Sequence, residues 1–290
     1  MQPIGESELI ITPKGTIYHL DLAPEQLADI VITVGDPGRV GAVSKYFDRI
    51  EHKAQHREFI THTGYFEGKR ISVVSTGIGT DNIDIVLNEF DALVNIDFNT
   101  RTVKEKTKSL SIIRLGTCGS LQPDVPVDSF VVSTSAIGLD NLMLYYPNVH
   151  NEQEQLLLEA FEQHMGFGSK IKPYISNASA HLLSLFSHGY IHGITATCPG
   201  FFGPQGRQLR AGISYSSLAD HLGTFKTGEQ RILNFEMETS ALYGLGKLLG
   251  HDVISISSVI NNRAQKTFSR NMSAAVDKMI RQSLEIIKTI

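Results

Sequence analysis

Two segments that follow hydrophobic runs combine arginine with closely spaced glycines. GDPGR occupies residues 35–39, and RLGTCGS occupies residues 114–120. The glycines Gly35 and Gly116 leave backbone N–H groups accessible, Thr117 adds a hydroxyl, and the guanidinium forks of Arg39 and Arg114 suit an oxyanion. A plain β-turn with a surface arginine is the alternative for the first segment, and a buried arginine–carboxylate pair is the alternative for the second. Both segments are therefore candidates for an anion site.

A third glycine-rich segment lies between a predicted strand and a predicted helix. Residues 76–82 read TGIGTDN, which imitates a dinucleotide-binding loop, but Asn82 stands where the third glycine is required. No acidic ribose-binding residue ends a following strand. A dinucleotide cofactor is therefore not expected, while a backbone cradle for one small anion at a helix N-terminus remains open.

Two further segments offer groups suited to an organic ligand. FFGPQGR at residues 201–207 places an aromatic pair before Gln205 and Arg207, which suits stacking and hydrogen bonding with a planar heterocycle. The alternative is a loop held only by buried phenylalanine. In FEMET at residues 235–239, Glu236 and Glu238 share a face if the segment is a strand and diverge if it is a helix. We expect at least one of these carboxylates to point into a pocket.

Composition excludes several classes of protein. Lys and Arg total 26 against 30 Asp and Glu, which gives a net charge of −4 and no basic footprint for nucleic acid. No apolar stretch approaches the ~20 residues of a membrane span, and the N-terminus does not resemble a secretory signal. Cys118 and Cys198 cannot form a disulfide framework, and His52, His56 and His62 have no metal-ligand spacing. We expect a cytoplasmic protein without a metal, and without nucleic-acid or membrane partners.

Strands and helices alternate along the chain, which predicts a single α/β domain over residues 1–290. The polar run at residues 99–109 is expected to be a solvated excursion. Predicted strands cover residues 30–34, 71–74, 111–115, 129–132, 191–197 and 253–260. Predicted helices cover residues 82–94, with Asp81 as N-cap, 152–165, 239–249, closed by Gly250, and a C-terminal stripe of Val276, Ile280, Leu284 and Ile287.

Taken in order, GDPGR, HREF at residues 56–59, STGIG, RLGTCG, FFGPQGR and FEMET resemble the uridine phosphorylases of the nucleoside phosphorylase superfamily. The resemblance runs from about His19 to the C-terminal helix. It implies a central mixed, partly barrel-like sheet flanked by helices. It also implies a pentosyltransferase that converts uridine and phosphate to uracil and ribose 1-phosphate, with phosphate as co-substrate and no cofactor.

The resemblance assigns roles by position. Arg39, Arg114, Arg207 and Glu238 would be catalytic. Phosphate would be bound by Gly35, Arg39, Arg57, Arg114 and Thr117, ribose by His19, Met237 and Glu238, and the base by Phe201, Gln205 and Arg207. Arg57 and His19 would reach the site of a neighbouring subunit, and Arg263 would lie near the base loop. A homodimer is favoured because residues 95–109 would cover surfaces used for hexamers, which are the alternative. Some family members also hold a cation between subunits at the position of Glu58, but Asn82 replaces the accompanying serine.

Three other functions remain as alternatives. A purine nucleoside phosphorylase would share the phosphate site but lack the Gln-x-Arg pair, and it would use an acid near Asn261. A nucleosidase uses water and would not need Arg39, Arg57 and Arg114 together. A non-catalytic nucleoside-binding protein would not need to retain all of these phosphate and ribose residues.

Overall fold

The computed structural model describes residues 2–147, 149–168 and 170–290, which build an α/β fold around one large mixed sheet. Its strands run in the order β11-β12-β10-β8-β13-β7-β1-β4-β3-β2, with β9 beside β8 and β14 beside β13. The bounds are β1 Ile30–Val34, β2 Arg49–His56, β3 Phe59–Phe66, β4 Lys69–Ser75, β7 Ser111–Ser120, β8 Phe130–Gly138, β9 Tyr174–Asn177, β10 Ile191–Thr197, β11 Lys226–Thr227, β12 Gln230–Glu236, β13 Asp252–Asn262 and β14 Thr267–Phe268.

Part of this sheet closes on itself. β13 pairs with β7 and β8, β10 joins β8 to β12, and β12 pairs back with β7 at Phe235–Gly119 and Asn234–Ser120. These five strands form the expected barrel-like unit. Residues 116–120 therefore belong to β7, whereas the sequence suggested that this strand ends at Leu115. The strand continues because β13 pairs with it along nearly its whole length.

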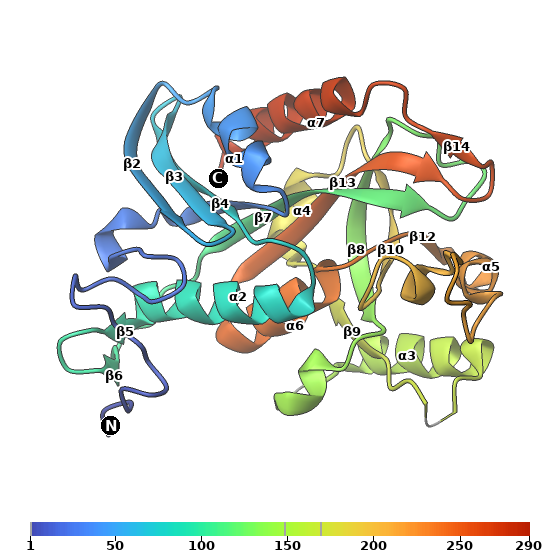
Figure 1. Ribbon diagram of the computed structural model, residues 1–290, viewed down its shortest axis with the longest axis horizontal. Coiled ribbons are helices and arrows are strands. Elements are labelled where there is room, and N and C mark those ends of the chain that lie inside the picture. Colours follow the sequence, from blue (N-terminus) through green and yellow to red (C-terminus); the bar gives the residue numbers. More distant parts are fainter. Residues whose placement is uncertain (1, 148, 169) are drawn as a thin grey trace.

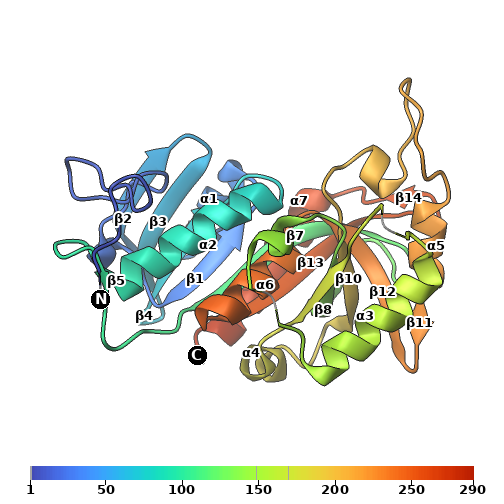
Figure 2. The same ribbon diagram turned by 90° about the horizontal axis from the view of Figure 1, so that it is seen from below.

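Helices cover both faces of the open part of the sheet (Figures 1 and 2). Neighbouring residues of β1 alternate between two cores, since Val31 packs with α2 and α6 while Ile32 packs with α1 and α7. A third core joins the barrel to α3 and α5. The helices are α1 Pro37–Ser44, α2 Thr80–Asn95, α3 Glu152–Met165, α4 Ala180–Leu185, α5 Leu218–Thr224, α6 Thr239–Leu249 and α7 Met272–Ile287, with short 3-10 helices η1 Pro24–Gln26, η2 Leu142–Tyr145 and η3 Gly203–Gln205.

Most predicted elements are confirmed, one predicted N-cap is wrong, and one of the stated alternatives is excluded. α2 begins at Thr80 with Gly79 as its N-cap residue, so Asp81 lies in the first turn. GDPGR is not a plain β-turn, because Asp36 caps α1 through the Gly38 N–H at 2.9 Å and places Arg39 in the first helical turn. The segment at residues 99–109 is mostly exposed, as expected, and the Lys104 ammonium anchors it by donating to the Val94 carbonyl at 2.9 Å.

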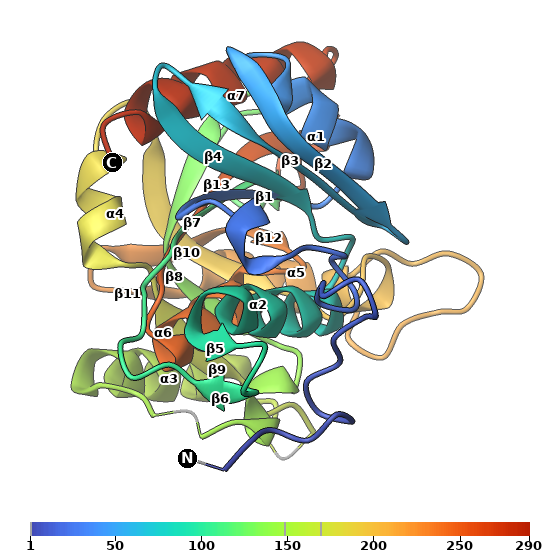
Figure 3. The same cartoon turned by 90° about the vertical axis from the view of Figure 1, so that its left-hand side faces the viewer.

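The hairpin around this segment pairs β5 Ile96–Asp97 with β6 Thr102–Val103. Arg101 ties it to the N-terminal segment by donating to the Ile4 carbonyl at 2.9 Å. At the other end of the molecule, the loop between η3 and α5 (residues 206–217, light orange) projects from the body (Figure 3). Within the described residues, no helix is long and apolar enough to cross a bilayer.

Candidate active site

A cavity of about 700 Å³ opens where the loops after several strands meet. The first turn of α1, the loop between β4 and α2, strand β7, the loop after β10 and the β12–α6 connection all contribute walls. Its lining residues are Gly35, Asp36, Pro37, Arg39, Glu58, Gly77, Ile78, Asn82, Arg114, Thr117, Cys118, Gly119, Phe201, Gln205, Arg207, Phe235, Glu236, Met237, Glu238, Ile260 and Asn261. The structure thus brings together nine of the eleven predicted site residues.

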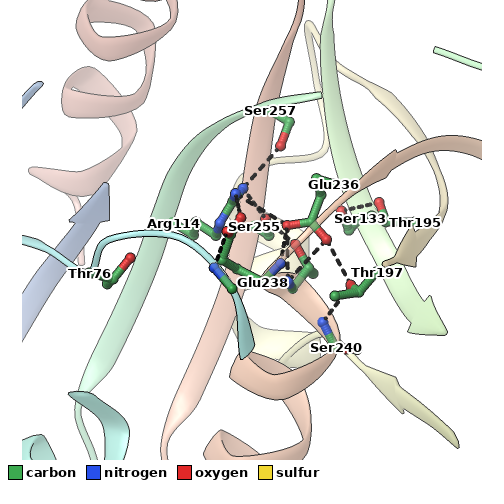
Figure 4. A network of polar contacts seen from close by, with 12 residues as sticks. Thr76, Arg114, Ser133, Thr195, Thr197, Glu236, Glu238, Ser240, Ser255 and Ser257 are labelled. Atoms are coloured by element: carbon green, nitrogen blue, oxygen red, sulfur yellow. Dashed lines mark hydrogen bonds and ion pairs between the residues drawn. The ribbon is translucent and has the colours of Figure 1, made fainter. Parts of the chain in front are cut away.

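Arg114 lies at the floor of this cavity and is only 5% exposed. Its Nη2 contacts Glu238 at 2.5 Å and Glu236 at 3.2 Å, and its Nη1 donates to Ser257 at 3.3 Å (Figure 4). Burial alone would lower the pKa of Arg114, but the two carboxylates raise it above its usual value. The buried carboxylate pair left open by the sequence is therefore present, and the guanidinium still faces the cavity.

Glu236 and Glu238 reach the same arginine from two kinds of backbone. Glu236 is the last residue of β12, and Glu238 immediately precedes α6. The segment is therefore neither a strand nor a helix throughout. A strand-to-helix turn sets the directions of the two carboxylates. Burial raises the pKa of Glu238, although the positive charge of Arg114 opposes this shift. Both carboxylates thus line the cavity, where the sequence required only one.

Arg39 supplies a second cation to the same end of the cavity. Its Nη1 donates to the Leu115 carbonyl at 3.2 Å. Burial lowers the pKa of Arg39, and the nearby positive charge of Arg114 acts in the same direction. Arg39 and Arg114 thus bring two guanidiniums, whose forks suit an oxyanion, beside the carboxylates of Glu236 and Glu238. Gly35 and Thr117 line the cavity as well.

The loop between β4 and α2 also carries backbone donors. Gly77 and Gly79 have positive φ angles of 71° and 98°, which suit glycine. The Gly79 N–H donates to a carboxylate oxygen of Glu238 at 2.8 Å. This loop therefore binds an anion as the sequence suggested, although in this structure the anion is a side chain of the protein.

Two glycines of β7 allow side chains to approach its backbone. A Cβ at Gly116 would lie 1.8 Å from Arg114 Nη1, and a Cβ at Gly119 would lie 2.5 Å from Asn261 Oδ1. Both glycines therefore serve close packing within a strand rather than a turn.

The residues suited to a planar ligand form a preassembled group. Arg207 stacks over the Phe201 ring at 3.8 Å and donates to the Phe201 carbonyl at 2.8 Å. It also donates to Oε1 of Gln205, which is only 3% exposed. Burial and the positive charge of Arg263 lower the pKa of Arg207 to about 10. Arg263 itself donates to the Gly206 carbonyl at 3.3 Å, so it lies at the base loop as predicted.

Two predicted residues lie outside the cavity lining. Arg57 is exposed at the tip of the β2–β3 hairpin, with a φ of 54°. His19 contacts Glu89 of α2 through Nδ1 at 2.6 Å, and Glu89 also accepts the backbone N–H of Leu20 at 2.9 Å. The cavity of one chain is therefore built without these two side chains.

Metal binding and thiol chemistry at this cavity depend on the distances between the candidate residues and on their burial. Asn82 donates its amide N–H to Glu58 Oε1 over 3.4 Å, at the place where the resemblance puts a cation. Within the described ranges, no three His, Cys, Asp or Glu side chains form a metal-binding group. Cys118 and Cys198 are free and buried, and burial raises the pKa of both thiols, which disfavours the reactive thiolate form.

Sequence reasoning missed several lining residues, among them Phe235, Ile260 and Asn261. Phe235 is fully buried in β12, where nothing in its local pattern separates a cavity wall from a core residue. For Asn261 the sequence indicated only that the acid of a purine nucleoside phosphorylase is absent at this position. Its Oδ1 is buried without a hydrogen-bond partner, which no sequence signal could have revealed.

Comparison with known proteins gives one consistent family. The uridine phosphorylase of Thermococcus kodakarensis is 29% identical over 264 residues, covering 89% of this chain and 82% of that protein. The DeoD-type purine nucleoside phosphorylase of Bacillus thuringiensis is 26% identical over 275 residues, covering 91% of this chain and 99% of that protein. A solved Trypanosoma brucei nucleoside phosphorylase with uridine phosphorylase activity superposes with a TM-score of 0.89 at 31% identity, covering 97% of this chain and 100% of that one.

A model of the phosphorylase superfamily matches residues 29–288, a span that holds every residue lining the cavity. The chain belongs to the phosphorylase superfamily, a family of enzymes.

Proposed function

We propose that this protein is a uridine phosphorylase, a pentosyltransferase acting on uridine and phosphate. One observation carries the proposal: a single cavity has two arginines at one end, the linked Gln205–Arg207 pair beside Phe201 at the other, and Glu238 in its wall. A sugar joined to a planar base, with phosphate beneath the sugar, matches this sequence of groups.

Arg39 and Arg114 would hold phosphate together with Thr117 and the backbone at Gly35. Bound there, a phosphate oxygen would attack C1′ as the bond from C1′ to N1 of uracil breaks. Its negative charge would also stabilise the positive charge that develops on the sugar. Phosphate is then both the nucleophile and the counter-charge, which explains the need for two closely placed guanidiniums.

Glu238 and Met237 would fix the ribose. A carboxylate accepts hydrogen bonds from two neighbouring hydroxyls, and Glu238 has both oxygens on the cavity side of α6, on Gly79 and on Arg114. To bind ribose, Glu238 would give up its contacts with Gly79 and Arg114 and accept hydrogen bonds from two ribose hydroxyls. Phosphate could then bind the freed Arg114, so the two substrates would favour each other's binding.

The base would be bound by Gln205 and Arg207 against Phe201. The bond from Arg207 to Oε1 fixes the amide orientation, so Nε2 is available to donate to a uracil carbonyl. Oε1 has a second lone pair for the uracil N3–H. Arg207 would stabilise the charge that moves onto O4 when the bond breaks. Cytosine carries an amino group in place of O4. This donor would face the guanidinium of Arg207, which has no acceptor atom to offer, so cytidine should bind poorly.

The protein would be a cytoplasmic homodimer. Arg57 and His19 of one subunit would complete the site of the other. Arg57 is an exposed cation at the turn of a two-residue hairpin, and its φ of 54° is costly for a residue other than glycine. For His19, the contact of Nδ1 with Glu89 directs the proton to Nδ1, so Nε2 can accept from the ribose 5′-hydroxyl.

The test is uracil release from uridine in buffers with and without phosphate. We expect release only with phosphate, together with ribose 1-phosphate in equal amount. Equal release without phosphate would identify a nucleosidase, and faster cleavage of inosine than of uridine would identify a purine nucleoside phosphorylase. No release from any nucleoside, with unchanged ligand binding, would identify a binding protein.

A further inference from the structure

Glu236 is the buried carboxylate of the cavity to which no substrate contact is assigned. It is 4% exposed and lies 3.2 Å from Arg114 Nη2. Its oxygens accept the Thr197 hydroxyl at 2.7 Å and the backbone N–H groups of Glu238 and Thr239, both at 3.0 Å (Figure 4). One side chain thus contacts the proposed phosphate-binding arginine and the start of the helix that carries the proposed ribose-binding carboxylate.

We propose that Glu236 is a positioning residue for phosphorolysis, which holds Arg114 in register with Glu238 while substrates exchange. This inference rests on the proposed function. Glu236 acts without touching phosphate, ribose or base.

The argument starts from the donors of Arg114. Nη1 faces Ser255 at 3.5 Å and Ser257 at 3.3 Å, while Nη2 contacts both carboxylates. When Glu238 turns to the ribose hydroxyls, the guanidinium loses its closer partner. A buried arginine without a counter-charge is strongly unfavourable, so a fixed carboxylate stabilises Arg114 whenever Glu238 has turned away and phosphate is not bound.

Glu236 can keep its contacts while substrates bind and leave. Its partners are a threonine hydroxyl of β10 and two N–H groups at the start of α6, and none of these belongs to a substrate. The N-terminus of a helix favours a carboxylate at this place. Glu238, in contrast, is held by Arg114 and by the Gly79 N–H, two donors that phosphate can also use. The two carboxylates therefore divide the work, since one is exchangeable and the other is fixed.

The charge of Glu236 makes a distinctive prediction for Glu236→Gln. Removing a negative charge close to Arg114 lowers the repulsion of a phosphate dianion, so the KM for phosphate should stay the same or fall. The amide keeps one acceptor oxygen and loses the ion pair, so Arg114 is less well fixed and kcat should fall by about 10- to 100-fold. A loss of stability alone would reduce the active fraction and leave both parameters of the folded enzyme unchanged.

Glu154→Gln is the matched control. Glu154 is 1% exposed, accepts the backbone N–H of Asn151 at 2.9 Å at the start of α3, and contacts Lys247 at 2.6 Å. Glu154 is likewise buried, bonded to a backbone N–H at the start of a helix and paired with a cation, but it does not line the cavity. Its kcat and KM should match those of the wild type. Thr197→Val removes the hydroxyl that donates to Glu236 and accepts the Ser240 N–H, and a smaller fall in kcat, about 3-fold or more, is expected if Glu236→Gln does not fold.

Initial rates are measured on the nucleoside that the wild type cleaves fastest among uridine, thymidine and inosine, with phosphate varied. Absence of uridine cleavage by the wild type refutes the proposed function alone, because the positioning test then proceeds on the other nucleosides. A lower kcat with an unchanged or lower phosphate KM supports the inference. A kcat within 3-fold of the wild type, a phosphate KM that rises as kcat falls, or an equal change in Glu154→Gln overturns it.

Discussion

Replacing Gly116 by alanine should disable the cavity without unfolding the protein. Gly116 lies inside β7, and its added Cβ would be 1.8 Å from Arg114 Nη1, 2.5 Å from Cζ and 2.8 Å from Nη2. The guanidinium must move by about 1.6 Å to reach an ordinary contact distance, because the backbone of a central strand cannot yield. Such a movement breaks its alignment with Glu236 and Glu238.

The size of the effect follows from this displacement. A misplacement of about 1 Å at a reacting centre can cost about 100-fold in rate, which corresponds to about 2.7 kcal/mol of transition-state stabilisation. We therefore expect kcat/KM for uridine and phosphate to fall at least about 100-fold in Gly116→Ala. The fold should persist, since the displaced atoms are the far end of a long side chain.

Steady-state phosphorolysis is the assay, with thermal unfolding as the measure of folding. Gly41→Ala in α1 is the control, because no heavy atom lies within 4 Å of its added Cβ. It should retain full activity and gain up to about 1 kcal/mol in helix propensity. Activity of Gly116→Ala within 3-fold of the wild type would show that the position of the Arg114 guanidinium does not limit the reaction.

Three further predictions follow from the same contacts. Arg207→Met should lower kcat/KM for uridine far more than it weakens phosphate binding measured by titration calorimetry, and equal losses in both would remove Arg207 from the base. Mixing the inactive variants Arg57→Ala and Arg114→Ala should restore part of the activity, because one site of each mixed dimer carries neither change, and no recovery after verified subunit exchange would exclude a shared site. Burial raises the pKa of Asp140, so the unfolded chain loses this proton first as the pH rises, and the free energy of unfolding falls through that range. Asp140→Asn should reduce this fall in denaturation series between roughly pH 4 and pH 8, and identical pH profiles would show that Asp140 does not titrate differently on folding.

Apolar runs and helical periodicity located the elements that bury at least one face. The predicted strand at residues 191–197 and the helices at residues 152–165 and 239–249 agree with the structure to the residue, since each is bounded by turn or capping signals. The hairpin of β2 and β3 was missed, because β2 alternates between exposed and half-buried polar residues and offers no apolar run.

The sequence indicated which residues line one cavity but not how their side chains pair. Glycines and arginines at the ends of apolar runs correctly indicated the cavity walls. The sequence could not show that Glu236 and Glu238 share one nitrogen of Arg114, because β7 and β12 meet only when the barrel closes. It likewise could not show that Gly116 provides space for a guanidinium within a strand, since Arg114 and Gly116 are two residues apart and their contact depends on the side-chain rotamer.

The two ends of the cavity differ in how firmly they are built, and this difference bears on specificity. Arg114 lies in β7, which is paired on both sides by β1 and β13, and its charge is buried in a hydrogen-bonded cluster. Gln205 and Arg207 lie in and beside a short 3-10 helix at the start of a projecting loop, where Phe201 is 48% exposed. Loops tolerate substitution better than central strands. Substitutions in the loop around Gln205 and Arg207 should therefore disturb little of the fold, whereas a substitution of Arg114 should disturb the barrel. This asymmetry accounts for a family in which proteins named for uridine and for purine nucleosides are both similar to this chain along most of its length.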